Sequence, residues 1–77
     1  MQYYTLVVYS SKDFNKKQVK TPKYDMRVRA FKTLQQAEDS IASIQCFKKQ
    51  IVKNAIEMRK EILKLQQIIN TLNNIEQ

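Results

Sequence analysis

A long stretch without Gly or Pro, residues 33–74, constrains this chain more than any other feature. Its apolar residues recur at alternating steps of three and four, a heptad pattern typical of a helix that buries one stripe against another helix. The pattern predicts a single long α-helix over residues 33–74. The residues of the apolar stripe are Leu34, Ala37, Ile41, Ile44, Ile51, Ala55, Met58, Ile62, Leu65, Ile69 and Leu72.

Both ends of the predicted helix carry signals of their own. Thr33 and Gln36 have the spacing of a capping box, in which each side chain bonds the backbone N–H of the other residue. Asn70, Asn73 and Asn74 lower the helix propensity, which predicts fraying beyond about Leu72.

Lys48 places a charge in the apolar stripe. A buried cation is costly unless it is paired. We interpret Lys48 as the point where a continuous helix changes its packing partner, from its own sheet to a second copy of the chain. A break near residues 47–50, which would give a helical hairpin, is the structural alternative.

A first β-strand is predicted over residues 2–9. This segment has a strand's length and is rich in β-branched and aromatic residues. Alternation places Tyr4, Leu6 and Val8 on one face, which we expect to face the core.

A second strand is predicted over residues 25–31, where apolar residues alternate with Arg27 and Arg29. We expect it to be half buried and antiparallel to the first strand. The two strands predict an N-terminal β-hairpin over residues 2–31, with an arginine row on its open face.

The connection between the strands, residues 10–24, is rich in lysine. Pro22 excludes a central strand there. We interpret this segment as a functional basic loop, with a plain exposed connection as the alternative. Its lysines are Lys12, Lys16, Lys17, Lys20 and Lys23.

The predicted fold is α+β: one domain over residues 1–77, in which the hairpin precedes one long C-terminal helix. Such a helix would extend about 60 Å and the strands about 20 Å, so the hairpin cannot cover it. A single Cys and no His leave no disulfide or zinc site to stabilise a chain of 77 residues. We therefore expect a homodimer or a higher homo-oligomer that pairs through Ile51, Ala55, Met58, Ile62, Leu65, Ile69 and Leu72.

The formal net charge is +7, and most of it lies in the first half of the chain. Residues 1–32 contain eight Lys and Arg against two Asp, which gives +6, and residues 33–77 contain six against five, which gives +1. A merely soluble surface more often mixes the two signs. This segregation of charge favours a polyanionic partner.

Nucleic acid is the polyanion that the residue pattern favours, with RNA preferred over DNA. Aromatic and arginine side chains on the outer face of the hairpin would stack unpaired bases and contact phosphate, and a lysine stripe that ends at Lys64 would follow the helix. An ordinary solvated sheet and helix surface is the alternative. The candidate nucleic-acid-binding residues are Tyr3, Tyr9, Lys12, Lys16, Lys17, Lys20, Lys23, Arg27, Arg29, Lys49, Lys53 and Lys60.

Catalytic and cofactor chemistry has little support in the sequence. The chain has no His, and Cys46 has no imidazole to activate it. Glu57 and Glu61 lie one helical turn apart, a spacing that could suit a metal ion. Lysines stand at ion-pair spacing from both, so we interpret this surface as a set of salt bridges and not as a metal site. Phosphate-binding loops need Gly, which the chain lacks. We expect neither an enzyme, nor a cofactor, nor a metal.

The sequence shows no targeting segment, and the apolar run over residues 6–8 is too short to cross a bilayer. We expect a cytoplasmic protein, in the host cytoplasm if it is viral. A basic helix lying on a membrane is disfavoured because the apolar stripe follows a coiled-coil period.

The order of the segments resembles that of the small accessory proteins of T-even-type bacteriophages. These segments are a Tyr-Thr-Leu-Val-Val-Tyr strand, a lysine loop, and Arg-Val-Arg-Ala-Phe-Lys-Thr-Leu leading into a Gln-, Asn- and Ile-rich helix. Among these proteins the layout is most similar to that of the RNA-binding inhibitors of the ToxN toxin. The resemblance implies a homodimer that binds RNA and counteracts a host ribonuclease toxin of an antiviral toxin–antitoxin defence. It covers length and layout and transfers no binding residue.

A protein-interaction module is the competing function. In that case the helix or the basic loop would bind an acidic host protein and block it. Loss of binding when Arg27 and Arg29 or the loop lysines are neutralised would favour the nucleic-acid hypothesis.

Overall fold

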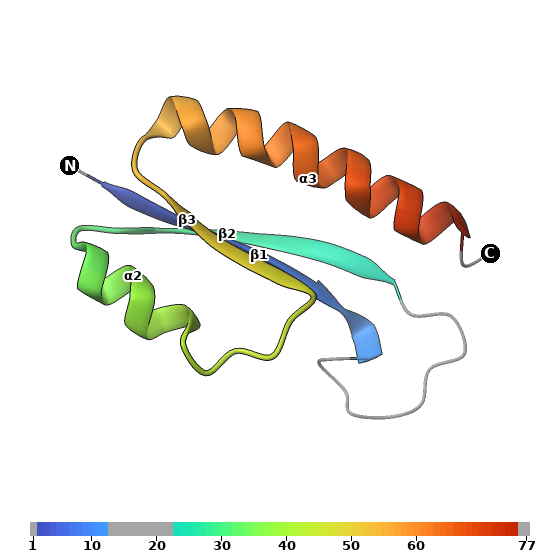
Figure 1. Cartoon of the computed structure of the whole chain (residues 1–77), viewed down its shortest axis with the longest axis horizontal. Helices are drawn as coiled ribbons and strands as arrows, with labels where there is room; N and C mark the ends of the chain where they lie inside the picture. Colours follow the sequence, from blue (N-terminus) through green and yellow to red (C-terminus); the bar gives the residue numbers. More distant parts are fainter. Residues whose placement is uncertain (1, 13–22, 76–77) are drawn as a thin grey trace.

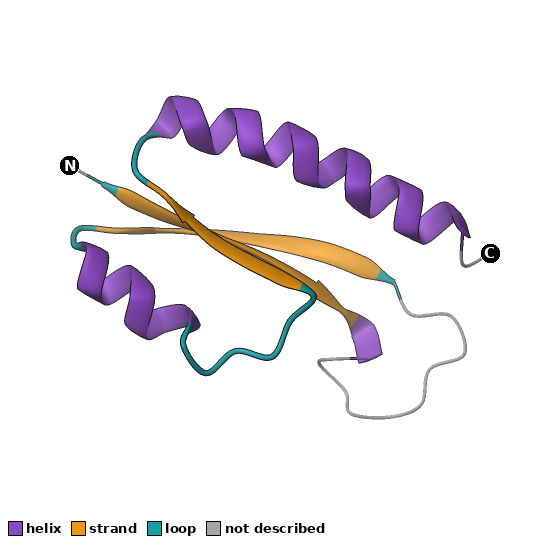
Figure 2. Ribbon diagram, in the orientation of Figure 1, coloured by secondary structure: helices purple, strands orange, loops and turns teal. Residues whose placement is uncertain are grey.

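The computed structural model describes residues 2–12 and 23–75 (Figure 1). The described elements form an α+β fold with a three-stranded antiparallel sheet, which confirms the predicted class. The sheet lies between two helices, with α3 on one face and α2 on the other (Figure 2). The elements are β1 (Tyr3–Ser10), β2 (Tyr24–Phe31), α2 (Leu34–Ile41), β3 (Lys48–Val52) and α3 (Ala55–Ile75).

β1 is the central strand, and its two neighbours run antiparallel to it in the order β2-β1-β3. β1 and β2 pair as the predicted hairpin, with Tyr3 opposite Phe31. A central strand has a helix over each face, which explains why β1 is the most apolar strand. Leu6 and Val8 on one face are 0% and 1% exposed, and Val7 on the other is 5% exposed.

The prediction of one continuous helix over residues 33–74 is wrong. α2 ends at Ile41, and residues 48–52 form β3 against β1 before α3 begins at Ala55. The free edge of β1 supplies backbone partners to β3, and Val52 becomes buried in the main core. These tertiary interactions outweigh the helix preference of the segment. The helical-hairpin alternative is also wrong, because a strand separates the two helices.

The structure tests two local predictions, the cap at Thr33 and the interpretation of Lys48. The Thr33 half of the predicted capping box is confirmed, since Thr33 Oγ1 accepts a hydrogen bond from the backbone N–H of Gln36 at 3.2 Å. Lys48 is the exposed first residue of β3. The gap in the apolar stripe between Ile44 and Ile51 therefore marks a loop and a strand.

The main core lies between α3 and the sheet. Leu65 and Ile69 of α3 are 1% and 3% exposed and pack with the β1 residues that share one face. The predicted core face of β1 is confirmed. The apolar stripe of α3 thus packs on the protein's own sheet. The cluster consists of Leu6, Val8, Val52, Leu65 and Ile69, with Tyr4, Tyr24, Met26, Met58 and Ile62 packed around it.

Asparagine side chains fix both ends of α3. Asn54 Oδ1 accepts a hydrogen bond at 2.8 Å from the backbone N–H three residues on, which caps the first turn. Asn73 bonds both backbone groups of Tyr24 in β2: its Oδ1 accepts from the N–H at 2.8 Å, and its Nδ2 donates to the carbonyl at 3.2 Å. α3 therefore continues to Ile75, and the predicted fraying beyond Leu72 is wrong.

The opposite face of the sheet is covered by the much shorter α2. Its buried residues, Ala37 and Ile41, lie on the side of the sheet that carries Thr5 and Val7. An eight-residue helix is about 12 Å long, whereas an eight-residue strand is about 27 Å long. α2 therefore leaves part of this face open.

Candidate nucleic-acid interface

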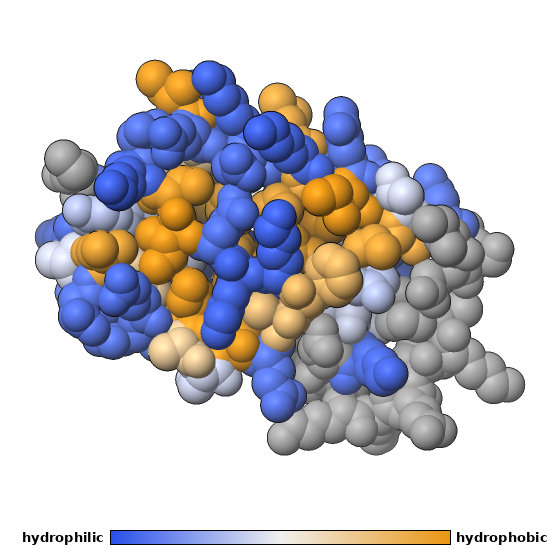
Figure 3. Space-filling view, viewed as in Figure 1, coloured by the Kyte–Doolittle hydropathy of each residue, from blue (hydrophilic) through white to orange (hydrophobic). Residues whose placement is uncertain are grey.

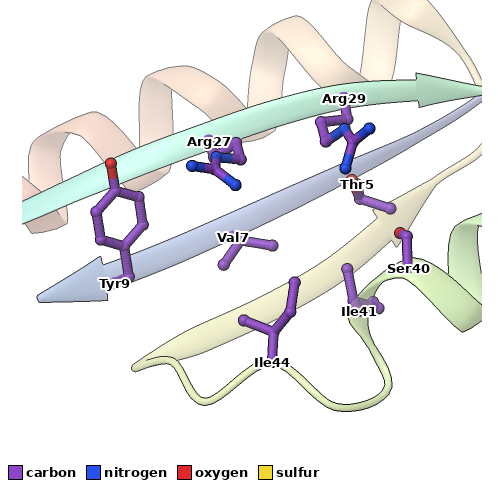
Figure 4. Close-up of a pocket in the computed structure, with 8 residues that line it drawn as sticks. All are labelled: Thr5, Val7, Tyr9, Arg27, Arg29, Ser40, Ile41 and Ile44. Atoms are coloured by element: carbon purple, nitrogen blue, oxygen red, sulfur yellow. The ribbon is translucent and has the colours of Figure 1, made fainter. Parts of the chain in front are cut away.

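The open part of the α2 face contains a hollow of about 110 Å³ (Figure 4). β1 forms its floor, β2 one wall, and the end of α2 with the loop after it the other wall. The residues that line it are Thr5, Val7, Tyr9, Arg27, Arg29, Ser40, Ile41 and Ile44.

The strand register explains how these side chains meet. Thr5 is paired with Arg29, and Val7 with Arg27. Side chains of directly opposed residues share one face of a sheet, and alternate residues of a strand do so as well. Tyr9 is therefore on the same face. We call the surface formed by these five residues the arginine face.

The floor of the hollow is buried and the rim is charged. Thr5 and Val7 are 1% and 5% exposed, whereas Arg27 and Arg29 are exposed. Arg29 Cζ lies 5.4 Å from the centroid of the Phe31 ring, a cation–π contact that orients the guanidinium. The hollow thus combines an apolar base with two cations at its edge.

Tyr9 and Asp25 lie at the end of the arginine face where β1 finishes. The Tyr9 hydroxyl donates a long hydrogen bond of 3.5 Å to Asp25 Oδ2. Asp25 is the only acidic residue of β2, and it is occupied further by the backbone N–H of Met26 at 2.8 Å. The two arginines of β2 therefore outnumber the acid on this strand.

The opposite wall is held in place by Lys49. Its Nζ donates to the carbonyl of Ile41 at 2.7 Å and to that of Ala42 at 3.5 Å. A cation at the C-terminus of a helix binds free carbonyls and is favoured by the helix dipole. Lys49, predicted to contact nucleic acid from a helical stripe, instead belongs to β3 and fixes the end of α2.

The structure brings three of the predicted binding residues together at the hollow: Tyr9, Arg27 and Arg29. Tyr3 is half-buried opposite Phe31 at the far end of the hairpin and does not line the hollow. The expected pairing of Tyr3 with Tyr9 in one small binding surface is thus only partly realised.

The predicted lysines are spread over the molecule. Lys12 and Lys23 are exposed at the loop end of the hairpin, where Ser11 and Lys23 are hydrogen-bonded to each other. Lys53 precedes α3, and Lys60 is exposed on α3 away from the arginine face. The remaining loop lysines, Lys16, Lys17 and Lys20, lie outside the described residues.

The residues predicted to pair two helices have other surroundings in the chain. Leu65 and Ile69 are buried in the main core, Met58 and Ile62 pack against it, and Ile51 is in β3. Ala55 and Leu72 are half-buried at the two ends of α3. The central residues of this set therefore contact the protein's own sheet, and pairing of two copies through the set stays a prediction.

The sequence pointed to the arginines but missed the other half of the hollow. Ser40, Ile41 and Ile44 fall in the first part of the predicted long helix, which was expected to pack on the sheet, but they were not linked to the arginines. Thr5 and Val7 were expected on a partly wet surface, yet α2 covers them. The alternation along β1 that places Tyr9 on the same face as the arginines also places Thr5 and Val7 on that face, so it could have identified these two residues.

Residues 2–12 and 23–75 can be compared with the requirements of a metal cluster and of a membrane-spanning helix. No group of acidic, His or Cys side chains there is placed to hold a metal ion. Glu61 accepts a hydrogen bond from Gln50 at 3.0 Å and lies 3.9 Å from Lys64 Nζ, an ion pair. None of the helices described is long and apolar enough to cross a membrane.

The dimensions of the hollow limit what it can bind. Pockets that enclose a drug-sized molecule measure about 300–1,000 Å³, well above the 110 Å³ found here. A hollow of this size can take only a small group. A phosphate attached to that group would meet the guanidiniums at the rim.

Comparison with known proteins gives no further guide to this site. No protein-family model, no curated protein and no solved structure matches the chain. The geometry of the arginine face and the charge of the chain are therefore the grounds for inferring a function.

Proposed function

We propose that the protein binds single-stranded RNA through the arginine face. The observation that carries the proposal is the position of Arg27 and Arg29 at the rim of an apolar hollow, with Tyr9 beside them (Figure 4). Proteins bind unpaired RNA by stacking bases on flat side chains and contacting the backbone with cations. The arginine face offers both kinds of contact.

The arrangement favours a single strand over a duplex. Arg27 and Arg29 are two residues apart on one strand, which spaces them by about 6.7 Å. A base must leave its pair before it can enter a hollow between a sheet and a helix, and unpaired bases do so at little cost. Lys12 and Lys23, exposed at the loop end of the hairpin, extend the cationic surface along the path of an RNA strand.

A narrower proposal concerns the biological role. The resemblance to phage inhibitors of the ToxN toxin supports a protein that acts in the cytoplasm of an infected cell and counteracts a host ribonuclease toxin by binding RNA. Expression of the protein beside an active toxin of this class tests the role. Rescue of growth by the unaltered protein, lost on neutralising Arg27 and Arg29, is the expected result. Equal rescue by the unaltered protein and by the neutralised variant would show that the role does not depend on RNA binding through Arg27 and Arg29.

RNA binding itself is tested by fluorescence anisotropy with a labelled single-stranded RNA. Arg27→Gln/Arg29→Gln should weaken binding at least tenfold, because each arginine that contacts phosphate or base contributes about 1–3 kcal/mol. It should also flatten the salt dependence by about 1.4 in slope, at about 0.7 for each phosphate contact to a single strand.

A matched control separates this site from general charge. Arg59→Gln/Lys60→Gln removes the same number of charges from exposed positions on α3, away from the hollow. We expect its affinity to fall by less than threefold. Equal losses in both variants would show that net charge, and not the arginine face, accounts for the binding.

A second candidate function, binding to an acidic protein, is favoured by one observation on α3. Ile56 and Leu63 are 67% and 68% exposed, and their separation of seven positions places both on the outward side of the helix. Arg59 and Lys60 lie between them in sequence and are exposed. An apolar pair flanked by cations suits a partner with an acidic groove.

A further inference from the structure

The outer edge of β3 is open in the described part of the molecule. β3 pairs with β1 on one side, and no described strand lies on its other side. In Figure 1 it is the nearest strand of the sheet, with no described helix or strand in front of it. An open edge presents backbone N–H and C=O groups to any strand that can align with it.

The two edges of the sheet differ. At the β2 edge, Asn73 occupies both backbone groups of Tyr24, and Arg27 and Arg29 project from the strand. Antiparallel pairing of two copies of β2 about Val28 would set Arg27 opposite the partner's Arg29, and like charges directly opposite each other are unfavourable. Antiparallel pairing of two copies of β3 about Gln50 places no lysine opposite a lysine.

Apolar side chains flank the open edge. Phe47, just before β3, is 53% exposed, and its backbone N–H donates to the carbonyl of Val8 at 2.8 Å. In Figure 3, apolar side chains gather on both sides of a central polar strip. An edge with apolar flanks is typical of an interface.

We propose that a second copy of this chain docks on β3, with the two β3 strands antiparallel about a two-fold axis at Gln50. The three strands of each copy then form one continuous sheet. This register sets Lys49 opposite the partner's Ile51 and Lys48 opposite the partner's Val52, so no lysine faces a lysine. Side-by-side parallel pairing would place the lysines of the two copies together.

The same register explains the exposed aromatic ring. One position before the strand, Phe47 is 53% exposed at the edge that a second copy would cover, and burial of such a ring in an interface is favourable. The Phe47 ring is already held by an edge-on contact with Tyr24, with the ring centroids 5.5 Å apart. The two-fold axis buries this already ordered ring twice, once in each copy.

A second copy fits this edge better than an unrelated chain because the contact is self-complementary. A two-fold axis makes the interface isologous and closes the assembly at two copies. An axis perpendicular to the sheet also keeps both α2 helices on one side. The two arginine faces then point the same way, although the docking itself does not depend on RNA binding.

Cysteine crosslinking tests the register. In a Cys46→Ser background, Gln50→Cys places two thiols on the axis, where opposed Cα atoms are about 4.5–5.5 Å apart, within disulfide range. Mild oxidation should convert most of this variant to a covalent dimer. Lys53→Cys in the same background is the control, because its two copies would lie about 20 Å apart. Lys53 is the more exposed residue, so random collision would favour the control.

Mixing two different cysteine variants tests the opposed pair next to Gln50. Lys49→Cys and Ile51→Cys proteins, mixed in the same background, should form the heterodimer in preference to either homodimer. Opposed residues in an antiparallel ladder alternate between hydrogen-bonded pairs and closer non-hydrogen-bonded pairs. The Gln50 pair and the Lys49–Ile51 pair are therefore of different types, and one of the two is the closer type. Equal crosslinking of all variants, or crosslinking of the Lys53 variant alone, would overturn the proposal.

Sedimentation of uncrosslinked protein completes the test. The unaltered chain should sediment as a dimer at micromolar concentration, and Phe47→Asp should shift it to a monomer with an unchanged far-UV spectrum. Ile56→Asp, at a similarly exposed position on α3, should leave the dimer intact. A monomeric unaltered chain contradicts the proposal, as does dissociation of the Ile56 variant alone.

Discussion

The two faces of the sheet are covered by helices of very different length. α3, with 21 residues, extends about 32 Å and buries one face along the whole strand, whereas α2, with eight residues, extends about 12 Å. The long helix produces a closed core, and the short one leaves a hollow. One face of this small protein thus provides stability, and the other provides an accessible surface with charged groups.

The helices also differ in how their ends are fixed. α3 is fixed to β2 by the amide of Asn73, which makes two hydrogen bonds to one residue. α2 is fixed by the Lys49 amine, which binds the last carbonyls of the helix. A lysine on a flexible stem constrains a helix less tightly than a paired amide. We therefore expect the α2 face to adapt to a ligand and the α3 face to stay rigid.

The largest expected effect concerns the α3 face. Leu65→Ala should lower the free energy of unfolding by about 2–5 kcal/mol, since it removes a side chain that is 1% exposed from a packed core. Leu63→Ala, two residues away and 68% exposed, should change it by less than about 0.5 kcal/mol. Urea denaturation measures both. Similar losses in the two variants would mean that α3 does not pack on the sheet through this stripe.

A smaller effect is expected on the α2 face, where packing is incomplete. Ile44→Trp places a large ring at the hollow and should weaken binding of single-stranded RNA about tenfold, which corresponds to about 1.4 kcal/mol. The free energy of unfolding should change little, because the ring enters space that is already open. Anisotropy and urea denaturation on the same sample measure the two quantities.

Leu34→Trp is the control for this variant. Leu34 is 40% exposed at the start of α2 and does not line the hollow. Its RNA affinity should stay within twofold of the unaltered protein. If the Leu34 variant lost as much affinity as the Ile44 variant, the hollow would have no special part in binding.

The smallest expected effect concerns the anchor of α3. Asn73→Ala leaves both backbone groups of Tyr24 without their partners and should cost about 1 kcal/mol. Asn70→Ala, which removes an exposed side-chain hydrogen bond to Gln66, should be close to neutral. Hydrogen exchange at the Tyr24 amide, faster in the first variant alone, is the readout. Unchanged exchange would show that Asn73 does not protect this edge.

Local patterns in the sequence predicted much of the fold. Alternation in β1 and β2 gave both strands and the core face of β1, because a strand with one face on a core must alternate. Thr33 gave the start of the first helix, because its side chain caps a turn a few residues away. Both signals depend on neighbours in sequence.

The remaining features depend on contacts between distant residues. A stripe such as Met58, Ile62, Leu65 and Ile69 fits another helix or a sheet equally well, so periodicity alone could not name its partner. β3 is stabilised by the free edge of β1, which lies some forty positions earlier in the chain and is invisible to local propensity. Lys49 likewise became a helix anchor only once β3 had formed.

The hollow was out of reach of the sequence for the same reason. The arginines were predicted correctly to share a face with Tyr9, because that follows from strand alternation. The opposite wall depends on where α2 ends and how the chain returns to form β3. Only the folded chain brings Ile41 and Ile44 over Val7.

The central claim is that the incompletely covered face of the sheet binds RNA. Amide and side-chain NMR shifts, followed during titration with a single-stranded RNA, test it most directly. Shifts centred on Thr5, Val7, Arg27, Arg29 and Ser40, with Leu65 and Ile69 unmoved, are the predicted result. Shifts confined to the outward side of α3 around Ile56 and Leu63, or no shifts at a saturating RNA concentration, would contradict the account.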